Sequence, residues 1–567
     1  MSPVATTDAP SHEVPPSISL SESDLSPQTA AIRSSALWAA WGDAIGFPTE
    51  LANEQLVARR LRGATLDDLP VSWERRVGGR MGPMVELPAG AYSDDTQLRL
   101  AVGRCIRAAG QFDVEVFSKV ELPVFLSYAL GAGRGTKAAA QGLARKAARW
   151  YSPFGKDARA YVGGGGNGAA MRIQPHVWAS PAWRPDAYLP QVLRDAICTH
   201  GHPRAIVGAL LHALCLGTAL HERQIPAPDR WVSMGKYLEV AKELPARDEA
   251  LAERWLFDWE QAAGRSWAEA TDEVIVETVG QLRIAAGRSH DSGAWAYQEL
   301  ALELGGLDPN TRGAGNVSAV LALWLAWHGQ NQPERALRDG AALLGSDTDT
   351  VASMAGALLG VIATDSPPDD LQDAELISAE ANRLASLRDR SVPSFPHPDP
   401  LHWQPPASLS DAYGTIGGVP YVAGLGVAEP LGELLRGQGK SGGIWQWVRL
   451  DFGQTLLIKR REHLSELSAS SMPRARTGHS PDDNEVPRRD VAAPSDRLSN
   501  GAATAGESNE LTIDSALAQV ARDRFDPLTV GVLTLRLSEG ADGPYNAGLF
   551  AFRVSELLRA EASRRSR

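Results

Sequence analysis

Residues 345–363, GSDTDTVASMAGALLGVIA, run from a short acidic segment straight into a stretch of small and apolar residues. These apolar residues recur at the i, i+3, i+4 spacing of a helix that buries one face. Residues 92–97, YSDDTQ, stand in the same relation to the run LRLAVGRCIRAAG that follows them. Because Asp, Ser and Thr are favoured in the first turn of a helix, each acidic segment is predicted to lie where a loop enters a helix.

The same helical spacing extends outward from these segments, from about Ala31 to about Leu387. It is carried by segments such as AIRSSALWAAWGDAIG, RAIVGALLHALCLGTALHE and VSAVLALWLAWHG. Glycine-rich loops interrupt it at 131–135 and 163–168. Because no convincing run of alternating strand residues is present, residues 31–387 are predicted to form an all-α domain.

Composition changes at residues 391–406, SVPSFPHPDPLHWQPP, which are rich in proline and aromatic residues. The stretch 443–461 partly alternates and is predicted to form a strand. Its alternating residues are Val448, Leu450 and Phe452 on one face and Trp445 and Trp447 on the other. These tryptophans, with Trp403, are expected in a core rather than on a recognition surface.

We therefore predict a smaller, mixed α/β accessory region whose first segment is 391–467. It either selects a modified partner or packs on the helical domain. Because the proline-rich stretch is typical of a domain boundary, a chain ending near Leu387 is expected to fold and keep its activity.

Three further segments complete the organisation. Residues 1–30 and 468–509 are rich in Ser, Pro and charged residues, and both are predicted to be disordered, as a tail and a linker. Residues 510–567 are predicted to form a C-terminal α/β segment. It would hold a helix, a short β element at LTVGVLTLRL (528–537) and a closing helix.

Composition narrows the class of protein. The chain has 567 residues and a net charge of −12, which argues against general nucleic-acid binding. Its three cysteines include no CxxC pair, so a disulfide framework and a cysteine zinc site are disfavoured. The N-terminus lacks the apolar core of a signal peptide, and the most apolar runs, 317–327 and 351–363, are shorter than a membrane span. A cytoplasmic protein without membrane contact is expected.

Helix capping explains one Asp or Ser at a helix start, but not paired carboxylates at two helix starts. Asp94, Asp95, Asp347 and Asp349 would repel one another if they clustered, and divalent cations would neutralise them. Carboxylate and hydroxyl oxygens suit hard ions, with Mg²⁺ first and Mn²⁺ or Ca²⁺ possible, and the lack of His and Cys disfavours zinc. The spacing alone leaves open whether these segments are a metal site or two helix caps.

Two further segments bear on this choice. Residues 163–172, GGGGNGAAMR, form a glycine-rich loop that runs into a helix, where backbone N–H groups could approach a phosphate. No Gly-Lys-Ser/Thr follows, so it is not a P-loop, and a flexible turn is the alternative. Residues 41–50, WGDAIGFPTE, add the carboxylates of Asp43 and Glu50.

Taken in order, five segments between about Ala31 and Thr364 resemble the ADP-ribosylglycohydrolase family. They are WGDAIGFPTE, YSDDTQ, GNGAAMRI, CTHGHPRA and GSDTDTVASMAGA. This sequence departs from the family pattern at Ser93, where the family mostly has Thr, but a hydroxyl remains.

The resemblance implies an all-α fold with two Mg²⁺ ions, with Mn²⁺ possible. The implied metal ligands are Ser93, Asp94, Asp95, Asp347, Asp349 and Thr350. Gly166, Asn167, Gly168 and His200 would contact ADP-ribose, and Glu50 or Asp95 would act as the base. Arg134 falls where the family often has another substrate loop.

The implied function is Mg²⁺-dependent hydrolysis of the glycosidic bond between ADP-ribose and an acceptor. The expected partner is an ADP-ribosylated protein, with arginine as the favoured acceptor, or a small molecule; serine side chains and nucleic-acid ends stay open as acceptors. Two alternatives stay open, an ADP-ribose-binding module without hydrolysis and a two-metal nucleotide phosphohydrolase. The arginine-rich segment from Arg59 to Met84 is predicted to be a solvated loop, with substrate gating as the alternative. His202 and His212 are predicted to be structural.

Overall fold

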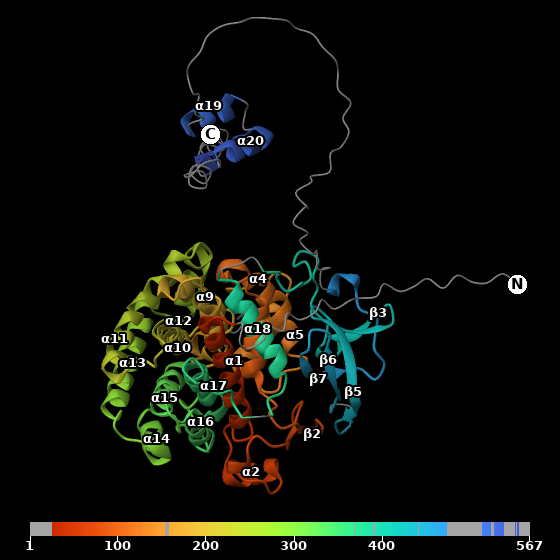
Figure 1. Ribbon diagram of the computed structural model, residues 1–567. Coiled ribbons are helices and arrows are strands. Elements are labelled where there is room, and N and C mark those ends of the chain that lie inside the picture. Colours follow the sequence, from red (N-terminus) through yellow and green to blue (C-terminus); the bar gives the residue numbers. More distant parts are fainter. Residues whose placement is uncertain are drawn as a thin grey trace, which may run out of the picture. The chain divides into compact units, whose positions relative to one another are not determined.

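The computed structural model describes residues 25–472, apart from 153–157, 369, 389–391 and 440–441 (Figure 1). Beyond residue 472 it describes 513–522, 527–537, 550–551 and 553–554. The chain divides into two compact units, Met1–Gly478 and His479–Arg567. Of the tail predicted for residues 1–30, residues 1–24 lie outside the described residues, and the prediction of disorder is wrong for 27–30, which begin the helix Pro27–Gly46. Of the linker predicted for 468–509, residues 473–509 lie outside the described residues, and Ala469–Ser471 form a 3-10 helix.

Helices dominate the first unit. Its helices are α1 (Pro27–Gly46), α2 (Glu54–Leu61), α3 (Asp94–Arg104), α4 (Val114–Val116), α5 (Leu122–Phe125), α6 (Arg134–Leu143), α7 (Ala158–Gly163), α8 (Gln174–Trp178), α9 (Pro185–Ile197), α10 (Pro203–Glu222), α11 (Pro228–Tyr237), α12 (Leu256–Ala263), α13 (Trp267–Gly287), α14 (Gly293–Glu303), α15 (Gly315–His328), α16 (Pro333–Ala341), α17 (Thr348–Leu359) and α18 (Ala374–Ser386). Its strands are β1 (Trp73–Arg76), β2 (Met84–Leu87), β3 (Tyr413–Ile416), β4 (Val419–Val422), β5 (Gly426–Arg436), β6 (Ile444–Leu450) and β7 (Thr455–Arg460).

Helices α1 and α17 pack together so closely that glycine is required at the contact. A Cβ atom on Gly42 would lie 2.4 Å from the carbonyl oxygen of Ala352, and one on Gly46 would lie 2.5 Å from the Cα of Asp349. A Cβ atom on Gly356 would lie 2.2 Å from the carbonyl oxygen of Trp38. The two helices therefore run antiparallel, and the end of α1 meets the acidic segment that begins α17.

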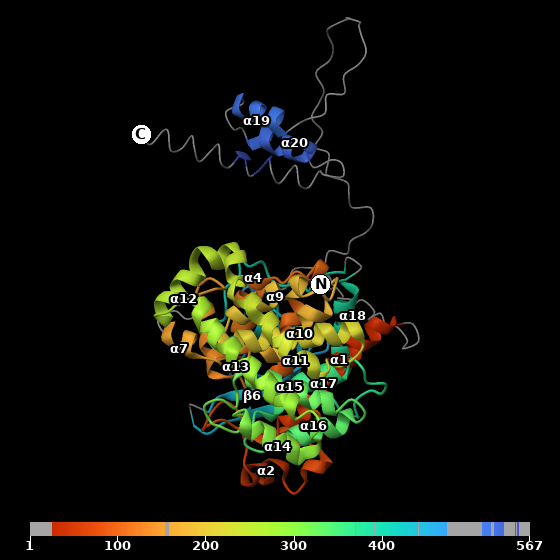
Figure 2. The same ribbon diagram turned by 90° about the vertical axis from the view of Figure 1, so that its left-hand side faces the viewer.

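Helices α10 and α15 lie beside α17 in the middle of the helical part (Figure 2). Among the described residues, α10 is the one helix long and apolar enough to cross a membrane, and 89% of its most apolar window is buried inside the protein. The apolar runs judged from the sequence, 317–327 and 351–363, are shorter than α10, in which His212 and His221 interrupt the apolar residues.

The segment from Arg59 to Met84 is not a plain solvated loop. It contains the end of α2 and most of an antiparallel hairpin in which Trp73 pairs with Leu87 and Arg76 with Met84. Trp73, Val85 and Leu87 are buried and fix this hairpin to the helices. The prediction that residues 31–387 are all-α is therefore wrong here, because strands of four residues offer too few alternating positions to be recognised.

The accessory region forms a five-stranded antiparallel sheet in the order β3-β4-β5-β6-β7. Strand β6 confirms the predicted strand, with Val448 and Leu450 buried, but Phe452 lies in the turn that follows it. Trp403 and Trp445 are buried as expected, and Trp447 is partly buried.

The sheet and the helices share one hydrophobic core and one compact unit. The indole Nε1 of Trp403 donates to the carbonyl of Lys119 at 2.7 Å, and the N–H of Lys459 donates to the carbonyl of Ser127 at 2.8 Å. Of the two roles considered for the accessory region, packing on the helical domain is thus observed. Because the sheet belongs to the same core, we now expect that a chain ending near Leu387 does not fold by itself.

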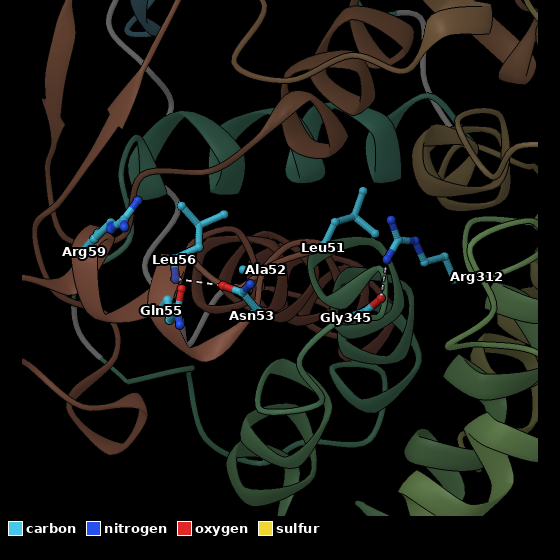
Figure 3. Close-up of a pocket in the computed structure, with 8 residues that line it drawn as sticks. All are labelled: Leu51, Ala52, Asn53, Gln55, Leu56, Arg59, Arg312 and Gly345. Carbon is cyan, nitrogen blue, oxygen red and sulfur yellow. Dashed lines mark hydrogen bonds between the residues drawn. The ribbon is translucent and has the colours of Figure 1, made fainter.

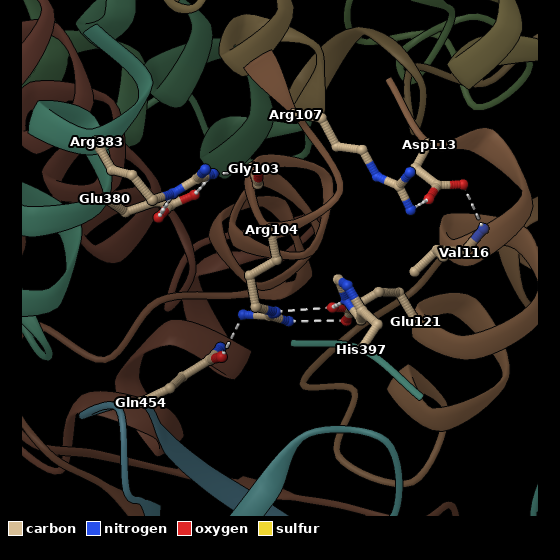
Figure 4. A network of polar contacts seen from close by, with 10 residues as sticks. All are labelled: Gly103, Arg104, Arg107, Asp113, Val116, Glu121, Glu380, Arg383, His397 and Gln454. Atoms are coloured by element: carbon tan, nitrogen blue, oxygen red, sulfur yellow. Dashed lines mark hydrogen bonds and ion pairs between the residues drawn. The ribbon is translucent and has the colours of Figure 1, made fainter. Parts of the chain in front are cut away.

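A buried polar network joins the two parts (Figure 4). Arg104 on α3 donates through Nε and Nη2 to the two carboxylate oxygens of Glu121, each at 2.8 Å, and through Nη1 to Gln454 at 2.8 Å. The Nε2 atom of His397 lies 2.8 Å from Glu121 Oε1. Cys105 is close enough to Glu121 and His397 for a metal site, but Arg104 already neutralises the only carboxylate of that group.

We expect Glu121→Gln to lower the free energy of unfolding by about 3–5 kcal/mol, because it leaves the Arg104 charge buried without a counter-charge. Burial alone would raise the pKa of Glu121, but the Arg104 charge and hydrogen bonds from Arg104 and His397 lower it from 4.5 to about 2. Because the folded pKa is the lower one, this stabilisation is present above about pH 4.5 and is lost as the pH falls towards 2.

Urea denaturation followed by tryptophan fluorescence measures this loss in the first unit alone, because every tryptophan lies between Trp38 and Trp447. Arg107→Ala is the control, because Arg107 is 58% exposed in its ion pair with Asp113, and ion pairs of exposed side chains contribute about 0–1 kcal/mol. Equal losses in the two variants would mean that the Arg104–Glu121 pair does not hold the parts together.

In the second unit, α19 (Ile513–Arg522) and α20 (Pro527–Leu537) pack through Ala516, Val520, Leu533 and Leu537. The predicted β element at 528–537 is wrong, because these residues form a helix. Val530, Leu533 and Leu537 recur at helical spacing and face α19, and this outweighs the scattered β-branched residues.

Candidate functional site

Six carboxylates converge where α1, α3 and α17 meet. They are Asp43 near the end of α1, Glu50 after it, Asp94 and Asp95 in the first turn of α3, and Asp347 and Asp349 at the start of α17. Oxygens of Glu50, Asp347 and Asp349 lie within 4.8 Å of one another. The structure thus brings together the carboxylates that the sequence placed in three separate segments.

Asp43 organises the first turn of α3. Its Oδ1 accepts from the N–H of Ser93 at 2.9 Å, and its Oδ2 accepts from the N–H and hydroxyl of Thr96 at 2.9 and 2.6 Å. The hydroxyl of Ser93 in turn accepts from the N–H of Asp95 at 3.1 Å. Asp43 was expected only as a further carboxylate, but a carboxylate among small apolar helix residues is itself a signal of a buried polar partner.

Helix capping does not account for all the acidic side chains at the starts of α3 and α17. Asp347 is the N-cap residue of α17, yet its side chain makes no capping hydrogen bond, and its Oδ2 accepts from the Nδ2 of Asn167 at 3.0 Å. Among the described residues, the buried Oδ2 atom of Asp95 has no hydrogen-bond partner. A buried, unpartnered carboxylate oxygen is costly, so these residues fit a hard cation better than two helix caps.

Electrostatics support the same fit. Burial, with the charges of Asp347 and Asp94, raises the pKa of Glu50 to about 7 against an opposing effect of Arg75. Burial also raises the pKa of Asp94 to about 6, and burial with neighbouring carboxylates raises the pKa of Asp349 well above its ordinary value. Ionising these buried carboxyls together is therefore unfavourable in the protein alone, and a bound divalent cation would favour their ionised forms.

The glycine-rich loop lies against this cluster. Gly166 forms a bridge with Ala314, and the N–H of Asn167 donates to the carbonyl of Gly313 at 2.9 Å. The Nδ2 atom of Asn167 reaches both Asp347 and Ser318, at 3.0 and 2.9 Å. Asn167 therefore links the loop directly to the second acidic segment.

His200 packs on the same loop. A Cβ atom on Gly168 would lie 2.9 Å from the ring Cε1 of His200, and one on Gly166 would lie 3.7 Å from its Nε2. Its Nδ1 lies 2.7 Å from the hydroxyl of Thr199. Burial lowers the pKa of His200 to about 3, so the ring is neutral at neutral pH.

Arg172, which was not among the predicted site residues, holds the glycine-rich loop in place through hydrogen bonds. It donates to the carbonyl of Gly168 at 2.6 Å, to the hydroxyl of Thr199 at 2.8 Å and to Asp195 at 2.9 Å. The guanidinium is fully buried. The sequence does contain a signal for this role, because Arg172 lies between the apolar residues Met171 and Ile173 at the end of a glycine-rich loop.

Of the remaining residues considered in the sequence, Arg134 lies near the acidic cluster, and His202 and His212 lie away from it. Arg134 is exposed at the start of α6, behind a loop so close to Asp94 that a Cβ atom on Gly131 would lie 1.9 Å from its Oδ1. His202 accepts from the N–H of Arg204 at 3.0 Å and caps α10, while His212 lies 3.0 Å from Gln174 in the core. Both histidines make structural contacts, as predicted.

Two arginines of the segment predicted to be solvated lie beside Glu50. Arg60 donates to the carbonyl of Pro48 at 2.7 Å, and the guanidinium of Arg75 lies 4.6 Å from the ring centroid of Phe47. Both charges favour the ionised form of Glu50. Helix α2, through Arg60, and the hairpin, through Arg75, therefore provide positive charge beside the acidic cluster.

A family model identifies the family of this chain. Residues 27–391 match the family described as ADP-ribosylglycohydrolase. The chain is 29% identical over 186 residues to an ADP-ribosyl-[dinitrogen reductase] glycohydrolase of Rhodospirillum rubrum; the match covers 32% of this chain and 56% of that relative. A solved structure described as an ADP-ribosylglycohydrolase-related protein complex covers 64% of this chain and 100% of its own, at 20% identity and a TM-score of 0.40. Since the family match spans more than half of the chain, this protein belongs to the ADP-ribosylglycohydrolase family.

Proposed function

We propose that the protein is a Mg²⁺-dependent hydrolase that cleaves the glycosidic bond between ADP-ribose and an acceptor, such as an arginine side chain of a protein. The observation that carries the proposal is the cluster of carboxylates with the unpartnered Asp95 oxygen, in contact with the glycine-rich loop through Asn167. The name of the Rhodospirillum relative supports the same reaction class.

The residues proposed to hold two Mg²⁺ ions are Ser93, Asp94, Asp95, Asp347, Asp349 and Thr350. All six lie where α3 and α17 begin; five are buried and Asp347 is partly buried. Bound Mg²⁺ supplies Lewis-acid polarisation of the ribose hydroxyls and of water. Mn²⁺ has the same preference for oxygen ligands and would substitute.

The chain's own residues bind and orient the substrate. Gly166, Asn167 and Gly168 are proposed to contact the ribose and diphosphate, and Gly168 has to be glycine because a Cβ atom there would lie 2.9 Å from the ring of His200. The neutral ring of His200 can stack or hydrogen-bond beside the sugar without adding charge. Glu50 and Asp95 are the candidates to accept the proton of the attacking water, and the cleaved bond is the one between ribose C1 and the acceptor atom.

Glu50→Gln and Asp95→Asn separate the two base candidates. We expect Glu50→Gln to hydrolyse about 10²–10⁴-fold more slowly while it binds Mg²⁺ and ADP-ribose nearly as the wild type does, because it removes general-base assistance alone. Asp95→Asn should lose Mg²⁺ affinity as well, because it also removes a ligand. Calorimetric titration with Mg²⁺ and ADP-ribose, paired with turnover rates, distinguishes these outcomes; near wild-type turnover in Glu50→Gln would leave Asp95 as the base.

The proposed function is tested with a protein substrate ADP-ribosylated on arginine. We expect free ADP-ribose to appear with Mg²⁺ or Mn²⁺ and not with EDTA. Tight binding of ADP-ribose without release from any acceptor would instead identify a binding module.

A further inference from the structure

A cavity of about 440 Å³ opens beside the acidic cluster (Figure 3). Leu51 and Leu56 line it between two arginines, Arg59 on α2 and Arg312 on the opposite side. The leucine side chains are 42% and 38% exposed, so the cavity offers apolar surface as well as positive charge. Neither the metal ligands nor the glycine-rich loop form part of this lining.

The cavity shares a wall with the acidic cluster. Leu51 directly follows Glu50, and its N–H donates to the carbonyl of Ser346 at 3.0 Å. Arg312 donates to the carbonyl of Gly345 at 3.0 Å, and a Cβ atom on Gly313 would lie 3.0 Å from Asp347 Oδ2. A group bound in the cavity therefore lies next to Glu50 and Asp347.

Leu51 has a left-handed backbone, with a φ of 51°. This conformation is uncommon for leucine, and such strain concentrates at functional sites. The strained backbone lies at the point where Glu50 of the acidic cluster is followed by Leu51, which lines the cavity.

Three neighbouring arginines of the segment 59–84 are held by contacts within the chain. Arg62 pairs with Glu74, Arg76 donates to the carbonyl of Gly82, and Arg60 donates to the carbonyl of Pro48. Arg59, by contrast, is exposed and lines the cavity. Positive charge beside leucine side chains suits a short acidic peptide.

We propose that this cavity binds the residues that flank the modified side chain of the acceptor protein, and that it selects acidic flanking residues. The inference rests on the proposed function. With ADP-ribose on the Asn167 side of Asp347, the acceptor extends on the Glu50 side, where the cavity lies. A nucleic-acid acceptor is less well matched, because it needs a continuous basic path and the cavity lining holds two arginines, Arg59 and Arg312.

Three substrates test the proposal with the full chain: free ADP-ribosyl-arginine, and two peptides in which an ADP-ribosylated arginine is flanked by acidic or by neutral polar residues. We expect kcat/KM for the acidic peptide to exceed that for the neutral one by about tenfold at low salt, and the ratio to shrink as salt rises. Arg59→Glu should reduce this ratio by about tenfold. Arg80→Glu, the same change at an exposed arginine outside the cavity lining, should keep it.

Fluorescence anisotropy with the two peptides on Glu50→Gln protein gives the same ratio without turnover. The proposal would be overturned if the acidic-to-neutral ratio of kcat/KM were near one in the wild type. It would also be overturned if this ratio were the same in the wild type and in Arg59→Glu, or if an ADP-ribosylated oligonucleotide were preferred over the acidic peptide in an Arg59-dependent manner. Hydrolysis of free ADP-ribosyl-arginine reports the proposed function separately, so the two failures are distinguishable.

Discussion

Asp349→Asn is expected to abolish hydrolysis, with a loss of at least about 10³-fold, because it removes a proposed metal ligand and several kcal/mol of transition-state stabilisation. Its effect on stability should depend on the cation. Burial and the charges of Glu50, Asp95, Asp347 and Asp43 raise the pKa of Asp349, so ionising it at neutral pH destabilises the cation-free fold. In EDTA the variant should therefore melt at the same temperature as the wild type or higher.

Mg²⁺ should reverse that order. Binding at 100 times Kd stabilises the native state by about 2.7 kcal/mol, so Mg²⁺ should raise the melting temperature of the wild type and not that of Asp349→Asn. Asp365→Asn, an exposed acid shortly after α17, serves as the control and should respond as the wild type does. Equal Mg²⁺-induced shifts in wild type and Asp349→Asn would exclude this metal site.

A chain that ends at Leu387 is expected not to fold. It loses the sheet whose side chains Val448, Leu450, Leu456, Leu457 and Ile458 belong to the common core. Each buried side chain of this kind contributes about 1.5–3 kcal/mol, against a net domain stability of about 5–15 kcal/mol.

The truncation should also disturb the acidic cluster, because it removes a hydrogen bond that links the sheet to the start of α3. The carboxylate of Asp373 accepts from the hydroxyl of Tyr92 at 2.7 Å and from the N–H of Thr455 at 2.8 Å, so the sheet is linked to the residue that precedes Ser93. A chain ending at Met472 keeps all of these contacts and is the control. Circular dichroism and urea denaturation compare the two chains; a cooperative, active protein ending at Leu387 would show that the sheet is a separate module.

The sequence predicted the helical scaffold and the carboxylates of the site because both depend on local patterns. Glycines and small residues in α1 and α17 recur at helical spacing, and paired acids at two helix starts exceed what capping needs. Asp43 and Arg172 were harder to recognise, because their partners Thr96 and Thr199 lie 53 and 27 residues away along the chain.

Other features depend on tertiary contacts that no local pattern shows. The hairpin at β1 and β2 is stabilised by burying Trp73 and Leu87 against helices, and α20 is helical because Leu533 and Leu537 face α19. The boundary predicted at the proline-rich stretch was plausible by composition. It did not anticipate that His397, just inside that stretch, contacts Glu121 at 2.8 Å.

The central claim is that the bond cleaved joins ribose to the acceptor. Its most direct test is the mass of the products when the full chain and Mg²⁺ act on a protein ADP-ribosylated on arginine. We expect intact ADP-ribose and the unmodified acceptor, with no product in EDTA. Release of AMP, with a phosphoribosyl group left on the acceptor, would show that the protein is a phosphohydrolase and contradict the claim.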